Sequence, residues 1–278
     1  MKKTFVIVLY KLKVEQSNTF RSLKDTLLVE DRQLDNIELI LYDNSPQAQE
    51  FNIDQYRNIN ITYKHDARNL GISTAYNYAL SIAKANGSEW LLLLDHDTEI
   101  TNEYMKQIMD LNEMNEHIVG VIPRIISENV MISPVYSNTL RPLHVKRPVA
   151  GIQEQPVMAI NSGTLLRVKF LEQIGGFNDE FPLDYLDHWL FHQIYETGYK
   201  VWLLNTMLEH ELSVMDYSRV SITRYKNILE SEINFYKNYK SDLYRSYRIQ
   251  LAKRFIKQLV TIKNKKIALH TLRRLFLW

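Results

Sequence analysis

A run of four leucines that ends in two aspartates is the feature that most constrains this chain. Leu91 to Leu94 form a continuous apolar run, as in a strand buried on both faces, and Asp95 and Asp97 follow at its carboxyl end. In open α/β sheets, ligands bind beyond the carboxyl ends of the strands, where the strand order reverses. Two carboxylates at this spacing are hard oxygen ligands that suit Mg²⁺ or Mn²⁺, whereas His96 between them points away. The alternative is a strand that ends in an ordinary polar turn.

Length and composition limit the classes of protein that need to be considered. The 278 residues are 45% hydrophobic, which fits one large domain or one domain with an appendage. A formal net charge of +2 argues against a nucleic-acid-binding protein, and the absence of cysteine excludes disulfides and thiolate metal sites. The apolar run at 5–10 is too short for a signal peptide, and no run approaches the roughly 18 residues that span a bilayer. We therefore expect a cytoplasmic protein.

Strands and helices alternate in the N-terminal part. Hydrophobic patterns predict strands at 5–10, 37–41, 59–63 and 90–94, and helices at 16–33 and 73–85. Such alternation is typical of a doubly wound α/β fold, so we predict a mostly parallel sheet flanked by helices.

The pattern changes from about residue 118. Further strands are predicted at 118–122, 125–126 and 199–204, and in the run 157–166, which Asn161-Ser162-Gly163 breaks; helices are predicted at 168–174 and 184–196. The proline-bearing stretch 127–156 predicts an irregular loop region, and long loops in compact domains are usually lids or binding loops.

The C-terminal part, residues 222–278, has a different composition. It is rich in Lys, Arg and Tyr, and its apolar residues interleave with basic ones as far as the terminal Trp278. This pattern predicts a basic amphipathic helical tail that lies on a membrane surface. The alternatives are a helical pair that packs on the domain or on another subunit, as in a homodimer.

Three polar positions follow the earlier predicted strands and point to a nucleotide. Asp43 can accept hydrogen bonds from a pyrimidine base or a ribose, or it can simply close an Asx turn. Arg68 can offset the charge of a diphosphate, or it can be a solvated surface residue. Gly71 can allow a close backbone approach at a helix start, or it can serve turn geometry alone.

The order of these motifs resembles the family 2 glycosyltransferases of the GT-A fold. The matching residues are the strand Phe5–Tyr10, Asp43-Asn44-Ser45, Asn69-Leu70-Gly71, Asp95-His96-Asp97, Asn161-Ser162-Gly163, Gly175-Gly176-Phe177 and Asp184–Trp189. The stretches Leu92–Thr98 and Phe181–Asp187 are similar to the bacterial rhamnosyltransferase branch, and the resemblance covers about residues 4–215.

The resemblance implies a role for each matching residue. Those expected at the nucleotide are Tyr10, Asp43, Arg68, Asn69, Gly71 and Asp95. His210 would complete a metal site with Asp97 and Asp95, although a lone histidine is more often structural.

The same resemblance assigns the catalytic base and the acceptor side. Asp187 lies where the family places the base, and Asp184, at i−3, would share its helix face and either bind and orient the acceptor or tune Asp187. The family usually has an acidic residue where this chain has Trp189. Trp189 would therefore be either an aromatic platform for an acceptor sugar or a core residue.

Together these features predict a metal-dependent inverting glycosyltransferase. Residues 1–221 would form the catalytic domain, with a nucleotide-sugar half at 1–117 and an acceptor half at 118–221, and 222–278 would be the tail. The donor would be a dTDP- or UDP-sugar, such as dTDP-rhamnose. The acceptor would be a lipid-linked or growing bacterial surface polysaccharide at the inner face of the cell membrane.

Two other functions compete with a glycosyltransferase. A sugar-nucleotide nucleotidyltransferase calls for a glycine-rich loop after the first strand, and Tyr10-Lys11-Leu12-Lys13 has no glycine. A non-catalytic nucleotide-sugar-binding or scaffold protein of the same fold would have no need of both metal carboxylates and Asp187.

Overall fold

The structure is a computed structural model that describes residues 1–27, 34–111, 114–140, 147–210 and 221–276. It divides into two compact units, one made of residues 1–136 and 144–211 and the other of residues 137–143 and 212–278. The predicted domain limits at 117 and 221 stay predictions, and residues 211–220 lie outside the described part. Each unit is described by itself.

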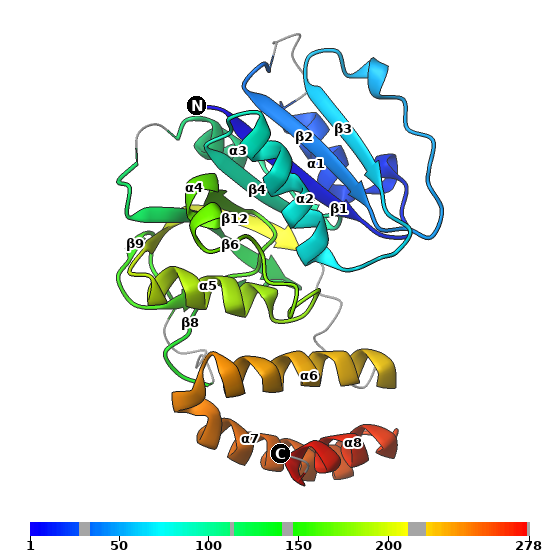
Figure 1. Ribbon diagram of the computed structural model, residues 1–278, viewed down its shortest axis with the longest axis vertical. Helices are drawn as coiled ribbons and strands as arrows, with labels where there is room; N and C mark the ends of the chain where they lie inside the picture. The colour runs from blue at the N-terminus through cyan, green and yellow to red at the C-terminus, as the bar shows by residue number, and fades with distance from the viewer. Residues whose placement is uncertain (28–33, 112–113, 141–146, 211–220, 277–278) are drawn as a thin grey trace. The chain divides into compact units, whose positions relative to one another are not determined.

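The first four strands of the N-terminal unit are parallel. They are β1 (Lys3–Leu9), β2 (Ile37–Asp43), β3 (Asn60–His65) and β4 (Trp90–Asp95), in the order β3-β2-β1-β4 (Figure 1). Every residue of β1 and β2 is buried, which explains why these segments read as apolar runs without alternation. The chain winds in opposite directions from β1, so the switch point of the sheet lies between β1 and β4.

The second half of the sheet is mixed. β11 (Thr164–Arg167) is antiparallel to both β4 and β6 (Ile118–Ser127), and β12 (Lys200–His210) is parallel to β6. The short β5 (Thr98–Glu99) pairs antiparallel with the end of β12. The sheet is thus parallel in its N-terminal part and mixed beyond β4.

Two strand predictions in this half need correction. β12 extends to His210 instead of ending at 204, because its second part alternates buried and exposed residues and therefore lacks an apolar run. The stretch 127–156 is not simply irregular, since it contains β7 (Val130–Ser133), β8 (Val135–Tyr136) and β9 (Gly151–Gln153). β7 forms a hairpin with β6 through Glu128 and Asn129, both of which have positive φ. The partners of β8 and β9, which are β10 (Val157–Met158) and β12, are distant in sequence, so no local signal marked those two strands.

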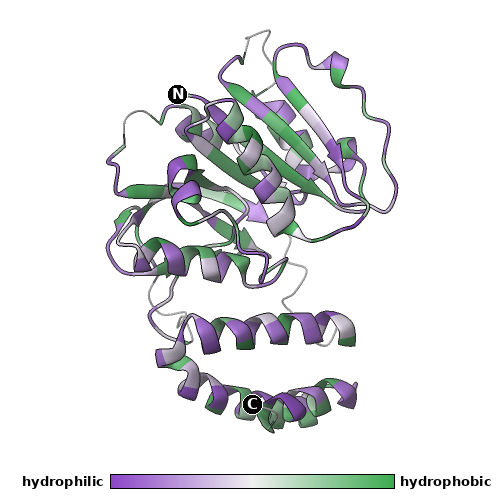
Figure 2. Cartoon of the chain, viewed as in Figure 1, coloured by the Kyte–Doolittle hydropathy of each residue, from purple (hydrophilic) through white to green (hydrophobic). Residues whose placement is uncertain are grey.

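Helices cover both faces of the sheet. α1 (Asn18–Leu27) contacts α3 (Asn102–Met109), and both contribute to one core with alternate residues of β1, as in the cluster Phe5, Ile7, Phe20 and Ile108. α2 (Ile72–Ala85) packs on β1 and β4 and contacts α4 (Val168–Gln173). The hydropathy colours of Figure 2 show that the strands between these helices are largely hydrophobic.

One further helix and two 3₁₀ turns complete the described part of the unit, and one of its helices, α3, was not predicted from the sequence. The further helix is α5 (Leu186–Glu196), and the 3₁₀ turns are η1 (Val14–Gln16) and η2 (Ile53–Gln55). Residues 28–33 of the predicted first helix lie outside the described part. The sequence interpretation overlooked α3, although Thr101 is a good N-cap residue and its side chain accepts a hydrogen bond from Tyr104 N.

The C-terminal unit contains three helices in its described part. They are α6 (Ile222–Asn238), α7 (Ser241–Thr261) and α8 (Lys265–Phe276), and each contacts the other two. The predicted tail is therefore a small helical unit with its own buried residues, among them Tyr225, Tyr247 and Ile267. Within the described ranges, no helix is both long and apolar enough to cross a bilayer. The terminal Leu277 and Trp278 lie outside them.

Candidate functional site

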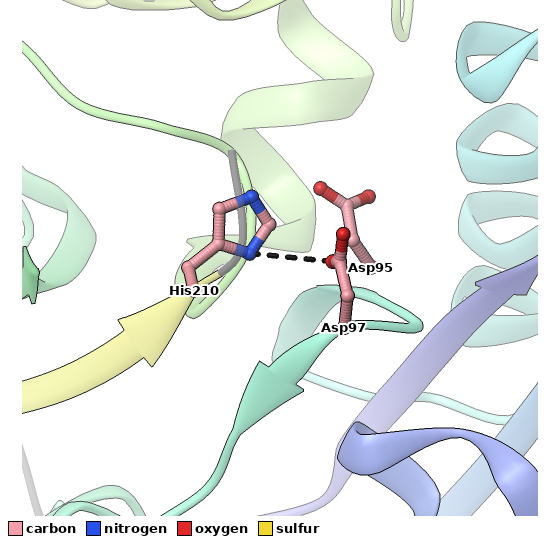
Figure 3. Close-up of side chains that lie close together, drawn as sticks. All are labelled: Asp95, Asp97 and His210. Carbon is pink, nitrogen blue, oxygen red and sulfur yellow. Dashed lines mark ion pairs between the residues drawn. The ribbon is translucent and has the colours of Figure 1, made fainter. Parts of the chain in front are cut away.

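Two aspartates and a histidine meet at the carboxyl edge of the sheet. Asp95 ends β4, Asp97 lies in the turn that follows, and His210 ends β12. His210 pairs with Thr98 of β5, so the antiparallel β5–β12 pairing places the imidazole beside Asp97. One ligand atom from each of the three residues lies within 4.8 Å of the other two, and the side chains point toward one another (Figure 3).

Asp97 has a buried oxygen that its own chain does not satisfy. Its Oδ1 is 3.3 Å from His210 Nδ1 but accepts no hydrogen bond from any described residue. The same nitrogen lies 2.9 Å from Thr98 Oγ1, which holds the ring in place. A buried acceptor without a partner is costly, so this arrangement indicates a site that is completed by a ligand.

Asp95 carries a second sign of an incomplete site. Burial raises the pKa of Asp95, and the neighbouring charge of Asp97 raises it further against the opposing effect of His210. A divalent cation between the two carboxylates would stabilise their charged forms. Two carboxylates and one imidazole suit Mn²⁺ or Mg²⁺, so Asp95, Asp97 and His210 fit the predicted metal site. His96 is not part of the cluster.

Ser162 helps to fix the geometry of the cluster through contacts with Asp95 and Thr98. Its Oγ accepts a hydrogen bond from Asp95 N at 2.9 Å and lies 2.6 Å from Thr98 Oγ1, which in turn contacts His210. Ser162 is fully buried. Its motif, Asn161-Ser162-Gly163, was recognised in the sequence, but the residue's contact with Asp95 depends on β11 lying beside β4 and could not be read from spacing.

Asp43 is buried at the end of β2 and is already fully engaged. It accepts hydrogen bonds from Ser45 N at 2.9 Å, Gln49 Nε2 at 2.9 Å and Tyr63 OH at 2.7 Å. Burial alone would raise its pKa, but these hydrogen bonds outweigh burial and hold the pKa below its usual value. The bond to Ser45 N is the Asx turn that the sequence left open as the structural alternative.

Hydrogen bonds to Asp66 hold the guanidinium group of Arg68 in place. Its Nε and Nη2 bond both oxygens of Asp66 at 2.8 and 2.6 Å, and Tyr42 OH adds a third bond at 2.8 Å. The Arg68 hydrogen bond is the main reason that the pKa of Asp66 lies well below its usual range. The Arg68 side chain is 69% exposed, so its charge faces solvent. Sequence reasoning missed Asp66, whose signal is the Asp-x-Arg spacing.

Gly71 does allow a close backbone approach, but the group that approaches belongs to the chain itself. Pro182 O accepts hydrogen bonds from Ile72 N at 2.6 Å and Ser73 N at 3.3 Å, at the start of α2. A Cβ on Gly71 would lie 2.1 Å from Pro182 O. The first amides of α2 are therefore bound to the segment before α5. Asn69 precedes them in a left-handed conformation, with φ at 48°.

Tyr10 follows β1 at the switch point. Its side chain is 41% exposed, and Lys11 Nζ lies 5.0 Å from the centre of its ring. Lys11 N donates to Ser45 Oγ at 2.7 Å, which ties the end of β1 to the turn after β2. This places an exposed aromatic ring beside the turn that contains Asp43.

Asp187 lies in the first turn of α5, and its charge acts on Tyr76 together with the charges of Asp95 and Asp97. Tyr76 OH of α2 lies 3.4 Å from Asp95 Oδ1. Burial raises the pKa of Tyr76 well above its usual value, and the charges of Asp95, Asp187 and Asp97 add to that shift. The charges of all three carboxylates thus affect the pKa of Tyr76, a residue that was not singled out from the sequence.

On the acceptor side, the structure contradicts the helix face that Asp184 was predicted to share with Asp187, and it buries Trp189. Asp184 does not share a helix face with Asp187, because α5 begins only at Leu186 and Tyr185 before it is left-handed, with φ at 65°. Trp189 is buried, with 5% of its surface exposed, which agrees with the core-packing alternative. The stacked pair Tyr185 and His188, with ring centres 4.4 Å apart, is the half-exposed aromatic feature beside Asp187.

Comparison with known proteins now identifies the family. Residues 6–175 match the model of glycosyl transferase family 2. A curated relative, the dTDP-rhamnosyl transferase RfbF of Shigella flexneri, is 29% identical over 124 residues, which are 43% of this chain and 41% of the relative. The chain therefore spans less than half of that relative's length.

Solved structures agree on the fold. S. aureus TarS superposes with a TM-score of 0.53 at 17% identity, covering 87% of this chain and 45% of TarS. TarS 1–349 in complex with UDP-GlcNAc gives a TM-score of 0.53 at 13% identity, covering 99% of this chain and 80% of that one. The architecture is the predicted GT-A type, a central sheet flanked by helices. The chain belongs to glycosyl transferase family 2.

Proposed function

We propose that this protein is a metal-dependent, inverting glycosyltransferase that moves a sugar from a nucleotide sugar to an acceptor hydroxyl. The observation that carries the proposal is the Asp95–Asp97–His210 cluster with its unsatisfied Asp97 oxygen. It lies at the carboxyl edge of the sheet, where β4 flanks the switch point and where α/β folds bind ligands. A divalent ion held there would offset charge on the leaving diphosphate.

Asp187 is the proposed catalytic base. Its carboxylate accepts the proton of the acceptor hydroxyl while that oxygen forms a bond to the anomeric carbon. The bond from the anomeric carbon to the diphosphate oxygen breaks, and the nucleoside diphosphate leaves with the electron pair. A single displacement of this kind inverts the anomeric configuration. Asp187 lies in the first turn of α5, where its Oδ1 accepts a hydrogen bond from His188 N at 2.8 Å, which helps to fix the position of the carboxylate.

The remaining polar groups are assigned to the substrates. Asp43 and Arg68, with Asn69 and Gly71 between Arg68 and α2, would border the nucleotide, and Tyr10 would contact its base or ribose. Asp184 is proposed to face the acceptor. Asp43, Arg68, Asn69 and Gly71 would line one side of the nucleotide site, and hydrogen bonds within the chain set the shape of that side.

For the donor we propose dTDP-rhamnose, on the strength of the RfbF relative. The TarS complex, in which UDP-GlcNAc is bound, keeps a UDP-sugar as the second candidate. For the acceptor we propose a lipid-linked or growing bacterial surface polysaccharide, reached from the inner face of the cell membrane.

A donor panel tests the reaction. Purified protein is incubated with dTDP-rhamnose, UDP-GlcNAc or other nucleotide sugars, with Mn²⁺ or with EDTA, and release of nucleoside diphosphate is measured. We expect metal-dependent release from one donor and a loss of about 100-fold or more in Asp187→Asn, with donor binding retained. Asp54→Asn, a change in an exposed carboxylate away from the site, is the control. Metal-dependent donor binding without turnover in the wild-type protein would instead support the scaffold alternative.

A further inference from the structure

The C-terminal unit is held together by a buried polar network that joins its three helices. Gln258 of α7 donates to Tyr225 OH of α6 at 2.8 Å and accepts from Thr271 of α8 at 2.8 Å, and Tyr225 OH lies 2.7 Å from Thr271 Oγ1. All three side chains are buried. Because such a network is satisfied in one arrangement only, it fixes the rotation of α7 about its own axis.

That rotation turns one apolar row of α7 outward. Ile249, Ile256 and Val260, spaced by seven and four residues, lie on one helix face and are 60%, 62% and 82% exposed. The buried residues Tyr247, Leu251 and Gln258 occupy the opposite face. Three large aliphatic side chains in one exposed row are unusual for a helix that otherwise packs well.

Basic residues are interleaved with this row. Lys253 lies one turn from Ile249, Lys257 lies one turn from Lys253, and both are exposed. The exposed face of α8 repeats the pattern, with Leu269 and Phe276, 47% and 80% exposed, beside Lys266 and Arg273. The alternating colours along both helices are visible in Figure 2.

The charge of this surface is not balanced locally. No acidic residue follows Asp242, whereas ten Lys and Arg residues do. The acidic side chains of α6 are engaged elsewhere, Glu232 with Arg254 at 2.6 Å and Glu230 with Arg274. The outward face of α7 therefore combines aliphatic groups with positive charge.

We propose that the outward face of α7, defined by Ile249, Lys253, Ile256, Lys257 and Val260, binds the surface of an anionic lipid bilayer. Aliphatic side chains enter the boundary between head groups and acyl chains while the lysines reach the phosphates. A nucleic acid would use the positive charge but leave the aliphatic row in water. A symmetric contact with a second copy would bring like charges together. The proposal draws on the proposed function only in that a lipid-linked acceptor gives this surface a use.

Vesicle sedimentation of the full chain tests it. The vesicles are either neutral phosphatidylcholine or phosphatidylcholine mixed with phosphatidylglycerol. One variant is Ile256→Ser with Val260→Ser and the other is Lys253→Gln with Lys257→Gln. Val130→Ser with Val149→Ser, an exposed apolar pair of the N-terminal unit, is the matched control. All these side chains are exposed, so the variants should fold, which circular dichroism checks.

We expect wild-type protein and control to sediment with anionic vesicles far more than with neutral ones. The lysine variant should lose about fivefold in partitioning per lysine, and the aliphatic variant should also be released. Equal sedimentation of wild type and both variants would overturn the proposal, as would a dimer-to-monomer change in the variants without any vesicle binding. Donor hydrolysis in solution, measured in parallel, should be unchanged, so failure of lipid binding is distinguishable from failure of the proposed reaction.

Discussion

The cluster side of the site, with Asp95, Asp97 and His210, and the proposed nucleotide side, with Asp43 and Asp66, use their carboxylates in opposite ways. Asp43 and Asp66 are saturated by hydrogen bonds from their own chain, and both have lowered pKa values. Asp95 has a raised pKa, and the Asp97 oxygen nearest His210 has no hydrogen-bond partner among the described residues. The carboxylates of Asp43 and Asp66 therefore have their hydrogen bonds without a ligand, whereas the pair of Asp95 and Asp97 leaves a buried oxygen without one in the described part of the chain.

This difference separates residues that shape the site from residues that bind in it. A saturated carboxylate rigidifies a wall and contributes to stability, since its charged form is solvated by the protein. An unsatisfied one lowers stability until a cation arrives. Substitutions should therefore affect ligand binding on the cluster side and folding on the nucleotide side.

The largest expected effect is on metal-dependent binding. Asp97→Asn removes a charged ligand but no hydrogen bond from the described residues, so affinity for a nucleoside diphosphate with Mn²⁺ should fall by about 100-fold or more. The free energy of unfolding without metal should not decrease. Calorimetric titration and urea unfolding measure the two quantities, with Glu99→Gln of β5 as the control. Unchanged metal dependence would remove Asp97 from the site.

Substitution of His210 should have a smaller effect on the same side. His210→Gln keeps a polar group beside Thr98 but loses the imidazole ligand, so we expect a reduction of about 10- to 100-fold in Mn²⁺ affinity. Electron paramagnetic resonance of free Mn²⁺ measures that affinity directly. Wild-type affinity in this variant would assign His210 a structural role only.

Gly71 should affect folding more than ligand affinity. Gly71→Ala places a Cβ 2.1 Å from Pro182 O at φ 103°, so we expect a loss of about 3 kcal/mol in the free energy of unfolding. Gly87→Ala also has a positive φ, 73°, but meets no atom within 4 Å, and should cost about 1 kcal/mol. Equal losses in the two variants would show that the Pro182 contact does not matter. Urea unfolding compares them.

The smallest expected effect is a pH dependence on the nucleotide side. The folded-state pKa of Asp66 is depressed, so its stabilisation is present above the unfolded pKa of about 3.9 and is lost as pH falls toward the folded value. Wild-type stability should therefore decrease between about pH 5 and pH 2 more steeply than that of Asp66→Asn. Urea unfolding across this range measures both slopes, and parallel slopes would contradict the assignment.

The sequence predicted the parts of the site that depend on strand order and local motifs. β4 with Asp95 and Asp97, and the polar turns after β2 and β3, follow from apolar runs and spacing. Spacing alone could not place residues brought in by long-range pairing: the family resemblance supplied His210, which the β5–β12 pairing brings to the cluster, but it did not supply the contacts of Ser162 and Tyr76 with Asp95. Ser162 reaches Asp95 because β11 lies beside β4, and Tyr76 reaches it from α2. The interpretation of Asp184 failed because periodicity does not reveal a left-handed cap such as Tyr185.

The most direct test of the central claim is anomalous diffraction from crystals of the protein grown with Mn²⁺ and dTDP. We predict a manganese peak between the carboxylates of Asp95 and Asp97 and the ring of His210, in contact with the diphosphate. A nucleotide bound at the edge of the sheet with no manganese peak at that cluster would contradict a metal-dependent mechanism at this site.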